Sequence, residues 1–177
     1  MGIKVNQETL QMIADLSNAR GASGFEDEAV QAAAKHIGGG YTTEEDCLRN
    51  FYMYRTANSG NKPVFMLDAH SDEVGFMVHS IRPNGTLRFV ALGGWNVGSL
   101  ASSKVLVRNS EGRYIPGVIA AKPVHFMSAS EKASAGAADI SSLSIDIGAV
   151  SAADAAENFK IRIGEPVVPD VALEYDE

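Results

Sequence analysis

A short apolar run, Val64-Phe65-Met66-Leu67, constrains the fold of this chain more than any other feature. Side chains of a strand alternate between two faces, so a run that is apolar throughout predicts a strand buried within a larger sheet. Such a strand needs neighbours, and the residues around it supply few of them. We therefore expect a thin α/β layer whose open sheet edge favours association.

The residues before this run follow mainly helical patterns. Asn6 can cap a first helix with one apolar face, which Gly21-Ala22-Ser23-Gly24 would end. A second helix is predicted to begin near Phe25, with acidic residues in its first turn, and to end at the glycines of 38–40. A strand is then predicted at 51–56.

From about residue 73 to 165 the pattern changes to short strands separated by turns, which is typical of a compact β-rich unit. The predicted strands are 74–81, 87–92, 104–108, 114–120, 143–147, 161–163 and 167–168. Asn84-Gly85 is typical of a hairpin turn, and Ser151 can cap a short helix. The stretch 128–142, rich in Ala, Ser and Gly, predicts a mobile loop.

Ionisable residues follow directly after the apolar run, in Asp68-Ala69-His70-Ser71-Asp72-Glu73. Open α/β sheets bind their ligands at strand ends, and a period of two would place Asp68, His70 and Asp72 on one face. A neutral imidazole is a good ligand for Zn²⁺ or Co²⁺, and a carboxylate two residues away can orient its ring. The alternative is an exposed polar loop with an incidental histidine, and the pattern alone leaves both open.

The other histidines and the cysteine lack the spacing of a metal site. His36 is predicted to have a structural role at a helix end, His79 to be an ordinary strand residue, and His125 to pack locally in a loop. The single cysteine, Cys47, can form neither an intramolecular disulfide nor a thiolate cage. No cofactor-binding motif is found.

Charge and targeting patterns restrict the class of protein. The formal net charge is −7 and no basic cluster occurs, which argues against nucleic acid or an anionic membrane as partner. The first residues lack the apolar stretch of a signal peptide, and no apolar run approaches the ~20 residues of a membrane span. We therefore expect a cytoplasmic protein.

Several segments, taken in order, resemble the signatures of the glutamyl aminopeptidase and deblocking aminopeptidase family, the TET-type dinuclear metalloaminopeptidases. They are Ala22-Ser23-Gly24-Phe25-Glu26, Leu67-Asp68-Ala69-His70-Ser71-Asp72-Glu73-Val74-Gly75-Phe76, Ala91-Leu92-Gly93-Gly94-Trp95, Pro116-Gly117-Val118-Ile119, Lys122-Pro123-Val124-His125, Ile145-Asp146-Ile147-Gly148-Ala149 and Gly164-Glu165-Pro166-Val167-Val168-Pro169-Asp170. The resemblance covers essentially the whole chain, and its specificity lies in the agreement of independent motifs in order.

This resemblance implies an α/β fold: part of a phosphorylase/hydrolase-like aminopeptidase domain with an inserted small, β-rich, PDZ-like barrel. It divides the chain into a first catalytic part (1–72), a dimerisation domain (73–165) and a truncated return segment to the catalytic domain (166–177). His70 would bind one of two catalytic metal ions, Zn or Co. Asp72 would be the catalytic-site carboxylate that orients and tunes His70.

The family's metal pair activates a water that attacks the first peptide bond of short peptides, and its members form dimers and dodecamers. The family's other ligands and its general base lie beyond the matched segments. The resemblance therefore implies the N-terminal half of an aminopeptidase, expected to be inactive alone. The alternatives are a non-catalytic oligomerisation module and a protein that binds one metal through His70, Asp72 and another carboxylate. Residue preference, Zn or Co, and dimer or dodecamer stay open.

Overall fold

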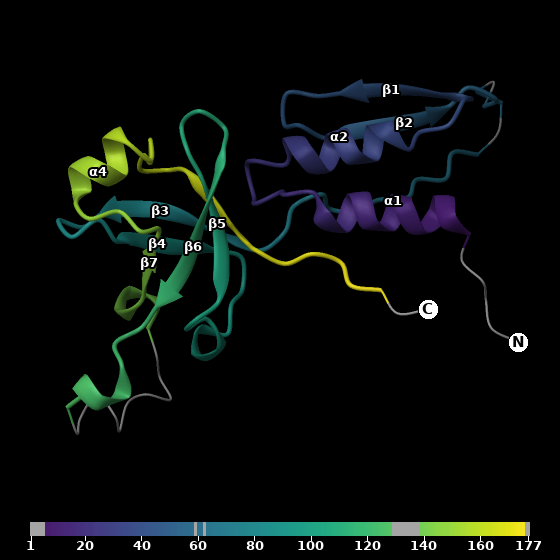
Figure 1. Cartoon of the computed structure of the whole chain (residues 1–177). Helices are drawn as coiled ribbons and strands as arrows, with labels where there is room; N and C mark the ends of the chain where they lie inside the picture. The colour runs from purple at the N-terminus through teal and green to yellow at the C-terminus, as the bar shows by residue number, and fades with distance from the viewer. Residues whose placement is uncertain (1–5, 59, 62, 129–138, 176–177) are drawn as a thin grey trace, which may run out of the picture.

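The computed structural model describes residues 6–58, 60–61, 63–128 and 139–175, which form a layer with two helices and a separate β-barrel (Figure 1). The layer contains α1 (Gln7–Asn18), α2 (Asp27–Lys35), β1 (Tyr41–Glu45) and β2 (Phe51–Arg55). The barrel part contains β3 (Gly75–Ile81), β4 (Leu87–Leu92), β5 (Lys104–Arg108), β6 (Tyr114–Ala120), β7 (Ser144–Asp146), α4 (Ala152–Glu157) and β8 (Pro166–Pro169). Short 3₁₀ turns lie at Val97–Ser99, Val124–Phe126 and Ile140–Ser142.

The helical layer is thin. The predicted cap of α1 is confirmed, because the Asn6 side chain accepts a hydrogen bond from the Thr9 N–H at 2.7 Å. Helices α1 and α2 lie together below the antiparallel hairpin of β1 and β2 (Figure 1). Helix α1 has no buried residue and α2 buries Val30 alone, so this layer has little core of its own.

The barrel is a closed antiparallel sheet with the strand order β3-β4-β7-β6-β5-β8. Strand β8 closes it, since Phe76 of β3 and Val107 of β5 both have Val167 as register partner. A closed barrel has no unpaired strand edge. Strand β8 lies within the segment that the sequence assigns to the return to the catalytic domain, so the barrel extends beyond residue 165.

The barrel core follows the alternation that the sequence predicts. On β5, Val105 and Val107 are buried, whereas Lys104 is exposed and Leu106 and Arg108 are half-buried. Phe76 is 1% exposed; its ring packs edge-on against Phe89 at 5.0 Å between centroids and stacks on Trp95 at 4.6 Å. These three aromatic rings join β3, β4 and the loop after β4 into one apolar interior.

The turn between β3 and β4 requires glycine. Gly85 has a φ of 88°, and a Cβ at this position would collide with the Ala149 carbonyl. The predicted Asn84-Gly85 hairpin is therefore confirmed, and its turn packs against the loop before α4.

Two predicted strands are absent. Residues 64–67 pair with no strand and are 77–87% exposed. The prediction of a buried strand there was wrong, because β1 and β2 pair only with each other and the described residues offer no other strand beside 64–67. The segment 161–163 is also not a strand: the Ile161 N–H bonds the Ala155 carbonyl of α4 at 3.0 Å.

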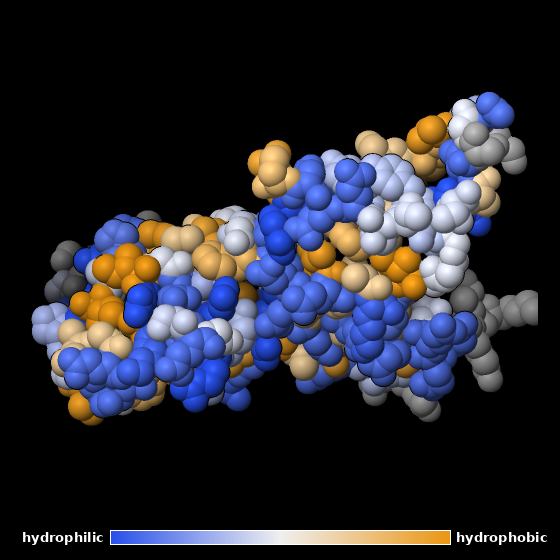
Figure 2. Space-filling view, turned by 90° about the horizontal axis from the view of Figure 1, so that it is seen from above, coloured by the Kyte–Doolittle hydropathy of each residue, from blue (hydrophilic) through white to orange (hydrophobic). Residues whose placement is uncertain are grey.

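Apolar and hydrophilic residues are interspersed over both the barrel and the helical layer in the view of Figure 2. None of the described helices is long and apolar enough to cross a membrane.

Most of the predicted loop at 128–142, namely residues 129–138, lies outside the described residues.

Candidate functional site

The predicted site residues lie in the connection from β2 to β3, where the helical layer meets the barrel. Residues 63–72 have no strand pairing, so a shared strand face does not align Asp68, His70 and Asp72 as predicted. The structure nevertheless brings His70 and Asp72 into direct contact. Asp68 is exposed and makes no hydrogen bond or ion pair with either of them among the described residues.

The contact between His70 and Asp72 determines which ring nitrogen carries the proton. His70 Nδ1 lies 2.9 Å from the Asp72 carbonyl oxygen and 3.1 Å from Asp72 Oδ1. Both oxygens are acceptors when the carboxyl is ionised, so Nδ1 must be the donor. Nε2 then keeps its lone pair, and it makes no hydrogen bond to any residue that the structure describes. The His70 side chain is 86% exposed.

Asp72 is held from the other side by the helical layer. The Ser23 hydroxyl donates a hydrogen bond of 2.5 Å to Asp72 Oδ2. This bond, with a smaller contribution from the positive charge of His70, holds the pKa of the Asp72 carboxyl below its ordinary value. Asp72 is therefore an ionised acceptor for His70 near neutral pH.

Backbone contacts fix the loop that carries Ser23 next to the site. The Glu73 N–H donates to the Gly21 carbonyl at 2.6 Å, and the Gly21 N–H donates to Glu73 Oε1 at 3.2 Å. Ala22, 1% exposed, forms a parallel bridge with Glu73. The loop that ends the first helical segment is thus joined to the residue that follows Asp72.

His70 is suited to be one ligand of a metal site, but the described residues do not supply the other ligands of such a site. A metal-binding histidine characteristically donates its second ring N–H to a carboxylate or carbonyl, and His70 does this with a free Nε2. A catalytic zinc site normally uses three protein ligands. The described residues contain no group of three His, Cys, Asp or Glu side chains that could hold an ion.

The remaining histidines are placed away from this pair. His36 Nε2 donates to Asp15 Oδ2 at 2.8 Å and joins the ends of α1 and α2, in line with its predicted structural role. His79 lies exposed on β3, and His125 lies exposed in the 3₁₀ turn after β6.

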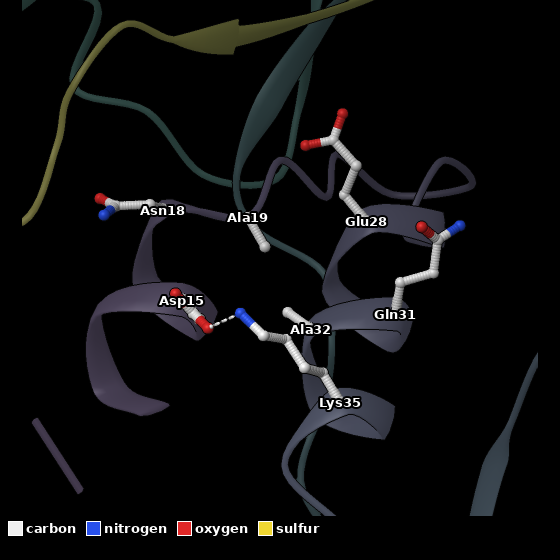
Figure 3. Close-up of a pocket in the computed structure, with 7 residues that line it drawn as sticks. All are labelled: Asp15, Asn18, Ala19, Glu28, Gln31, Ala32 and Lys35. Carbon is white, nitrogen blue, oxygen red and sulfur yellow. Dashed lines mark hydrogen bonds and ion pairs between the residues drawn. The ribbon is translucent and has the colours of Figure 1, made fainter. Parts of the chain in front are cut away.

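A groove of about 290 Å³ lies between α1 and α2 (Figure 3). Its central carboxylate, Asp15, accepts hydrogen bonds from Lys35 Nζ at 2.6 Å, Gln11 Nε2 at 2.7 Å and His36 at 2.8 Å. The bonds from Lys35, Gln11 and His36, in falling order of effect, hold the pKa of Asp15 well below its ordinary value. Because its charge is already paired, we assign the groove to helix packing and not to ligand binding.

Replacing Asp15 by asparagine is expected to remove an acid-sensitive part of the stability of the helix pair. A folded-state pKa below the ordinary value of 3.8 contributes stability that is complete above 3.8 and is lost as the pH falls below it. Denaturation followed by helical circular dichroism should therefore show Asp15→Asn less stable than the wild type near neutral pH. The difference should shrink below pH 3.8, whereas the exposed control Asp68→Asn should match the wild type throughout. A difference that does not change with pH would contradict this assignment.

Ser23 is the contributor that sequence reasoning did not assign. It lies 49 positions from Asp72 in the sequence, and neither local periodicity nor spacing links residues so far apart. Its only signal was membership of the segment Ala22-Ser23-Gly24-Phe25-Glu26, which carried no role for the hydroxyl.

Comparisons with known proteins agree with the sequence resemblance. The model of the M42 glutamyl aminopeptidase family matches residues 50–175. Glutamyl aminopeptidase from Lactococcus lactis is 33% identical over 164 residues, which are 92% of this chain and 46% of that protein. The chain thus spans less than half the length of this relative.

Solved structures match over nearly the whole chain. A TET aminopeptidase from a Thaumarchaeota archaeon aligns with a TM-score of 0.86 and 30% identity, covering 96% of this chain and 46% of that one. The TET1 peptidase of Pyrococcus horikoshii, reported to assemble into a tetrahedron or a large octahedral shell, aligns with a TM-score of 0.72 and 23% identity, covering 91% and 46%. The second similarity concerns the fold alone. From the family match and the TET aminopeptidase fold with its six-stranded barrel, we conclude that this chain belongs to the M42 glutamyl aminopeptidase family.

Proposed function

We propose that this chain supplies the first metal-binding segment of an M42 aminopeptidase. His70 binds one of two divalent ions, Zn or Co, through Nε2, and Asp72 fixes the ring in the tautomer that leaves Nε2 free. The single observation that carries this assignment is that His70 Nδ1 faces two acceptors, the carbonyl oxygen and Oδ1 of Asp72. When bound, the metal pair supplies an activated water for hydrolysis of the first peptide bond of a short peptide.

Among the residues that the structure describes the same site is incomplete, and we propose that the chain alone hydrolyses no peptide. His70 and Asp72 are the only members of the predicted site that the structure brings together among its described residues. One imidazole cannot fix a metal pair with the geometry that hydrolysis requires. We propose that the remaining ligands come from polypeptide outside the segments matched here.

We propose different roles for the segments of the chain. We propose that residues 1–72 belong to the first part of the catalytic α/β domain, 73–165 to the PDZ-like dimerisation domain and 166–177 to the return segment. Strand β8, which lies in the last of these segments, is also a strand of the barrel. We also propose a homo-oligomer, either a dimer or a dodecamer. In support, the Pyrococcus horikoshii relative can assemble into a tetrahedron or a large octahedral shell, and another structure of similar fold is a dodecamer. The cytoplasmic location is proposed from the sequence.

A non-catalytic oligomerisation module is the second candidate, and one observation favours it. The barrel is closed and holds a continuous buried core, whereas the helical layer buries few apolar residues. The barrel can therefore keep its fold, and an assembly role, without a functioning metal site. Stable dimers that bind no metal would favour this candidate over the first.

The test is an aminopeptidase assay of the mass-verified 177-residue chain with glutamyl, aspartyl, leucyl and lysyl substrates, with added Zn²⁺ or Co²⁺. His70→Ala is assayed in parallel. We expect no turnover by either protein. Metal-dependent turnover that disappears in His70→Ala would show that these residues suffice for hydrolysis, and the proposed incompleteness would be wrong.

A further inference from the structure

We propose that Ser23 is a positioning residue for His70, acting through Asp72 to keep the Nε2 atom of His70 available for a metal ion. This inference rests on the proposed function and deepens it, because it adds the helical layer to the construction of the site. The observation behind it is a chain of two hydrogen bonds that joins Ser23 to Asp72 and Asp72 to His70.

In each of these two hydrogen bonds, only one of the two partners can be the donor. The ionised Asp72 carboxylate can only accept, so the Ser23 hydroxyl must donate to Oδ2. The other oxygen, Oδ1, accepts from His70 Nδ1 at 3.1 Å. Ser23 therefore occupies one side of the carboxylate and turns its second oxygen toward the imidazole.

Ser23 is suited to this task because its backbone is fixed. The neighbouring Ala22 is buried and bridges to Glu73, and the Gly21 carbonyl accepts the Glu73 N–H at 2.6 Å. Gly21 also packs closely there, since a Cβ on it would lie 3.2 Å from the Ser71 carbonyl oxygen. The hydroxyl thus approaches Asp72 from a loop tied to the residues on both sides of it.

Without the Ser23 hydroxyl, the Asp72 carboxylate would lose the hydrogen bond to Oδ2 that orients it. The Asp72 side chain is 37% exposed and His70 is 86% exposed, so water can compete for both groups. The backbone carbonyl of Asp72 would remain as an acceptor for His70 Nδ1, at 2.9 Å. Loss of the hydroxyl is therefore expected to weaken the preferred tautomer and not to abolish it.

The test measures the His70 ring directly, without enzymatic activity. In the ¹⁵N-labelled 177-residue chain, long-range ¹H–¹⁵N spectra at a pH where imidazole is neutral show which ring nitrogen carries the proton. We expect Nδ1 to be protonated in the wild type and both ring nitrogens to shift toward averaged values in Ser23→Ala. Ser23→Thr, which keeps a hydroxyl, should restore the wild-type pattern.

Two controls separate this role from general destabilisation. Ser99→Ala removes a hydroxyl that donates to the Asn96 carbonyl in the barrel, and it should leave the His70 spectrum unchanged. The signals of His79 and His125 serve as internal references in every variant. Amide spectra check that each variant is folded.

A Zn²⁺ titration of the same samples connects positioning to metal binding. Partners outside the ligand shell typically alter metal affinity by about 10–100-fold, so we expect the Zn²⁺ concentration that half-shifts the His70 signals to rise about tenfold in Ser23→Ala. If Zn²⁺ leaves the wild-type His70 signals unchanged while the tautomer behaves as expected, the metal role of the proposed function fails and the Ser23 inference stands.

The Ser23 inference is overturned if His70 carries its proton on Nε2 in the wild type, which needs no variant at all. It is also overturned if folded Ser23→Ala has the wild-type His70 spectrum. Should Ser23→Ala fail to fold, the wild-type tautomer and Ser23→Thr still decide the question, since a shifted spectrum in folded Ser23→Thr contradicts the hydroxyl role.

Discussion

Replacing His70 by alanine is expected to abolish aminopeptidase activity once the chain is completed by the remaining segment of an M42 enzyme. The alanine removes the imidazole whose Nδ1 is held by Asp72 and whose Nε2 makes no hydrogen bond to any described residue. The proposed function makes His70 a metal ligand. Loss of such a ligand removes several kcal/mol of transition-state stabilisation, so turnover should fall by about three orders of magnitude or more.

The measurement uses a fusion of this chain to the segment that follows the matched region in the Lactococcus lactis glutamyl aminopeptidase. Turnover of aminoacyl substrates with Zn²⁺ or Co²⁺ is compared between the fusion and its His70→Ala variant. His79→Ala is the matched control, because His79 lies exposed on β3 and has no contact with Asp72 among the described residues. Retained activity in His70→Ala, or an equal loss in both variants, would remove His70 from the metal site.

The largest expected effect on stability is that of Phe76→Ala in the barrel. Phe76 is 1% exposed and contacts Phe89 and Trp95 at the point where β3 meets β8. Truncating a buried phenylalanine leaves a cavity and costs about 3–5 kcal/mol of unfolding free energy. Whole domains have only about 5–15 kcal/mol, so this single change removes a large share of it.

Urea denaturation followed by the fluorescence of Trp95, the only tryptophan, measures this loss, with circular dichroism as a second probe. Phe126→Ala is the matched control: Phe126 is 75% exposed, and its loss should alter the unfolding free energy by about 0.5 kcal/mol or less. Equal effects of the two substitutions would contradict the assignment of Phe76 to the core.

The barrel was the most predictable part of the fold. Lys104–Arg108 and Tyr114–Ala120 were predicted as strands, and they are the paired strands β5 and β6 with the predicted bounds. Their side chains alternate between core and solvent, and their partners are near in sequence, so local pattern and tertiary structure agree. The Asn84-Gly85 turn was predictable for the same reason.

Secondary structure was wrongly predicted, or missed, where it is determined by neighbouring elements and not by the local sequence pattern. Residues 64–67 have the composition of a buried strand, but no partner strand is present among the described residues and they lie exposed. Strand β1, Tyr41–Glu45, was not predicted, because all five of its residues are exposed and give no apolar periodicity. The segment 161–163 was misassigned because Ile161 packs against the end of α4.

The candidate site was predictable only in part, because one of its contacts is local in sequence and the other is not. His70 and Asp72 are two residues apart, so their contact follows from local spacing even though the strand expected there is absent. Ser23 reaches Asp72 from a distant loop, and such a contact depends on how the helical layer docks on the barrel. Spacing rules act within one element and cannot identify a partner of this kind.

The way in which β8 closes the barrel has a consequence for the order of events during synthesis. Strand β8 lies between β3 and β5, so the barrel can close only when β3, its first strand, pairs with β8, its last. Pairing between such distant segments is slow to form, and the growing chain exposes apolar strands in the interval. We therefore expect a nascent chain that has not yet emerged from the ribosome past residue 169 to be more prone to aggregation than the closed barrel.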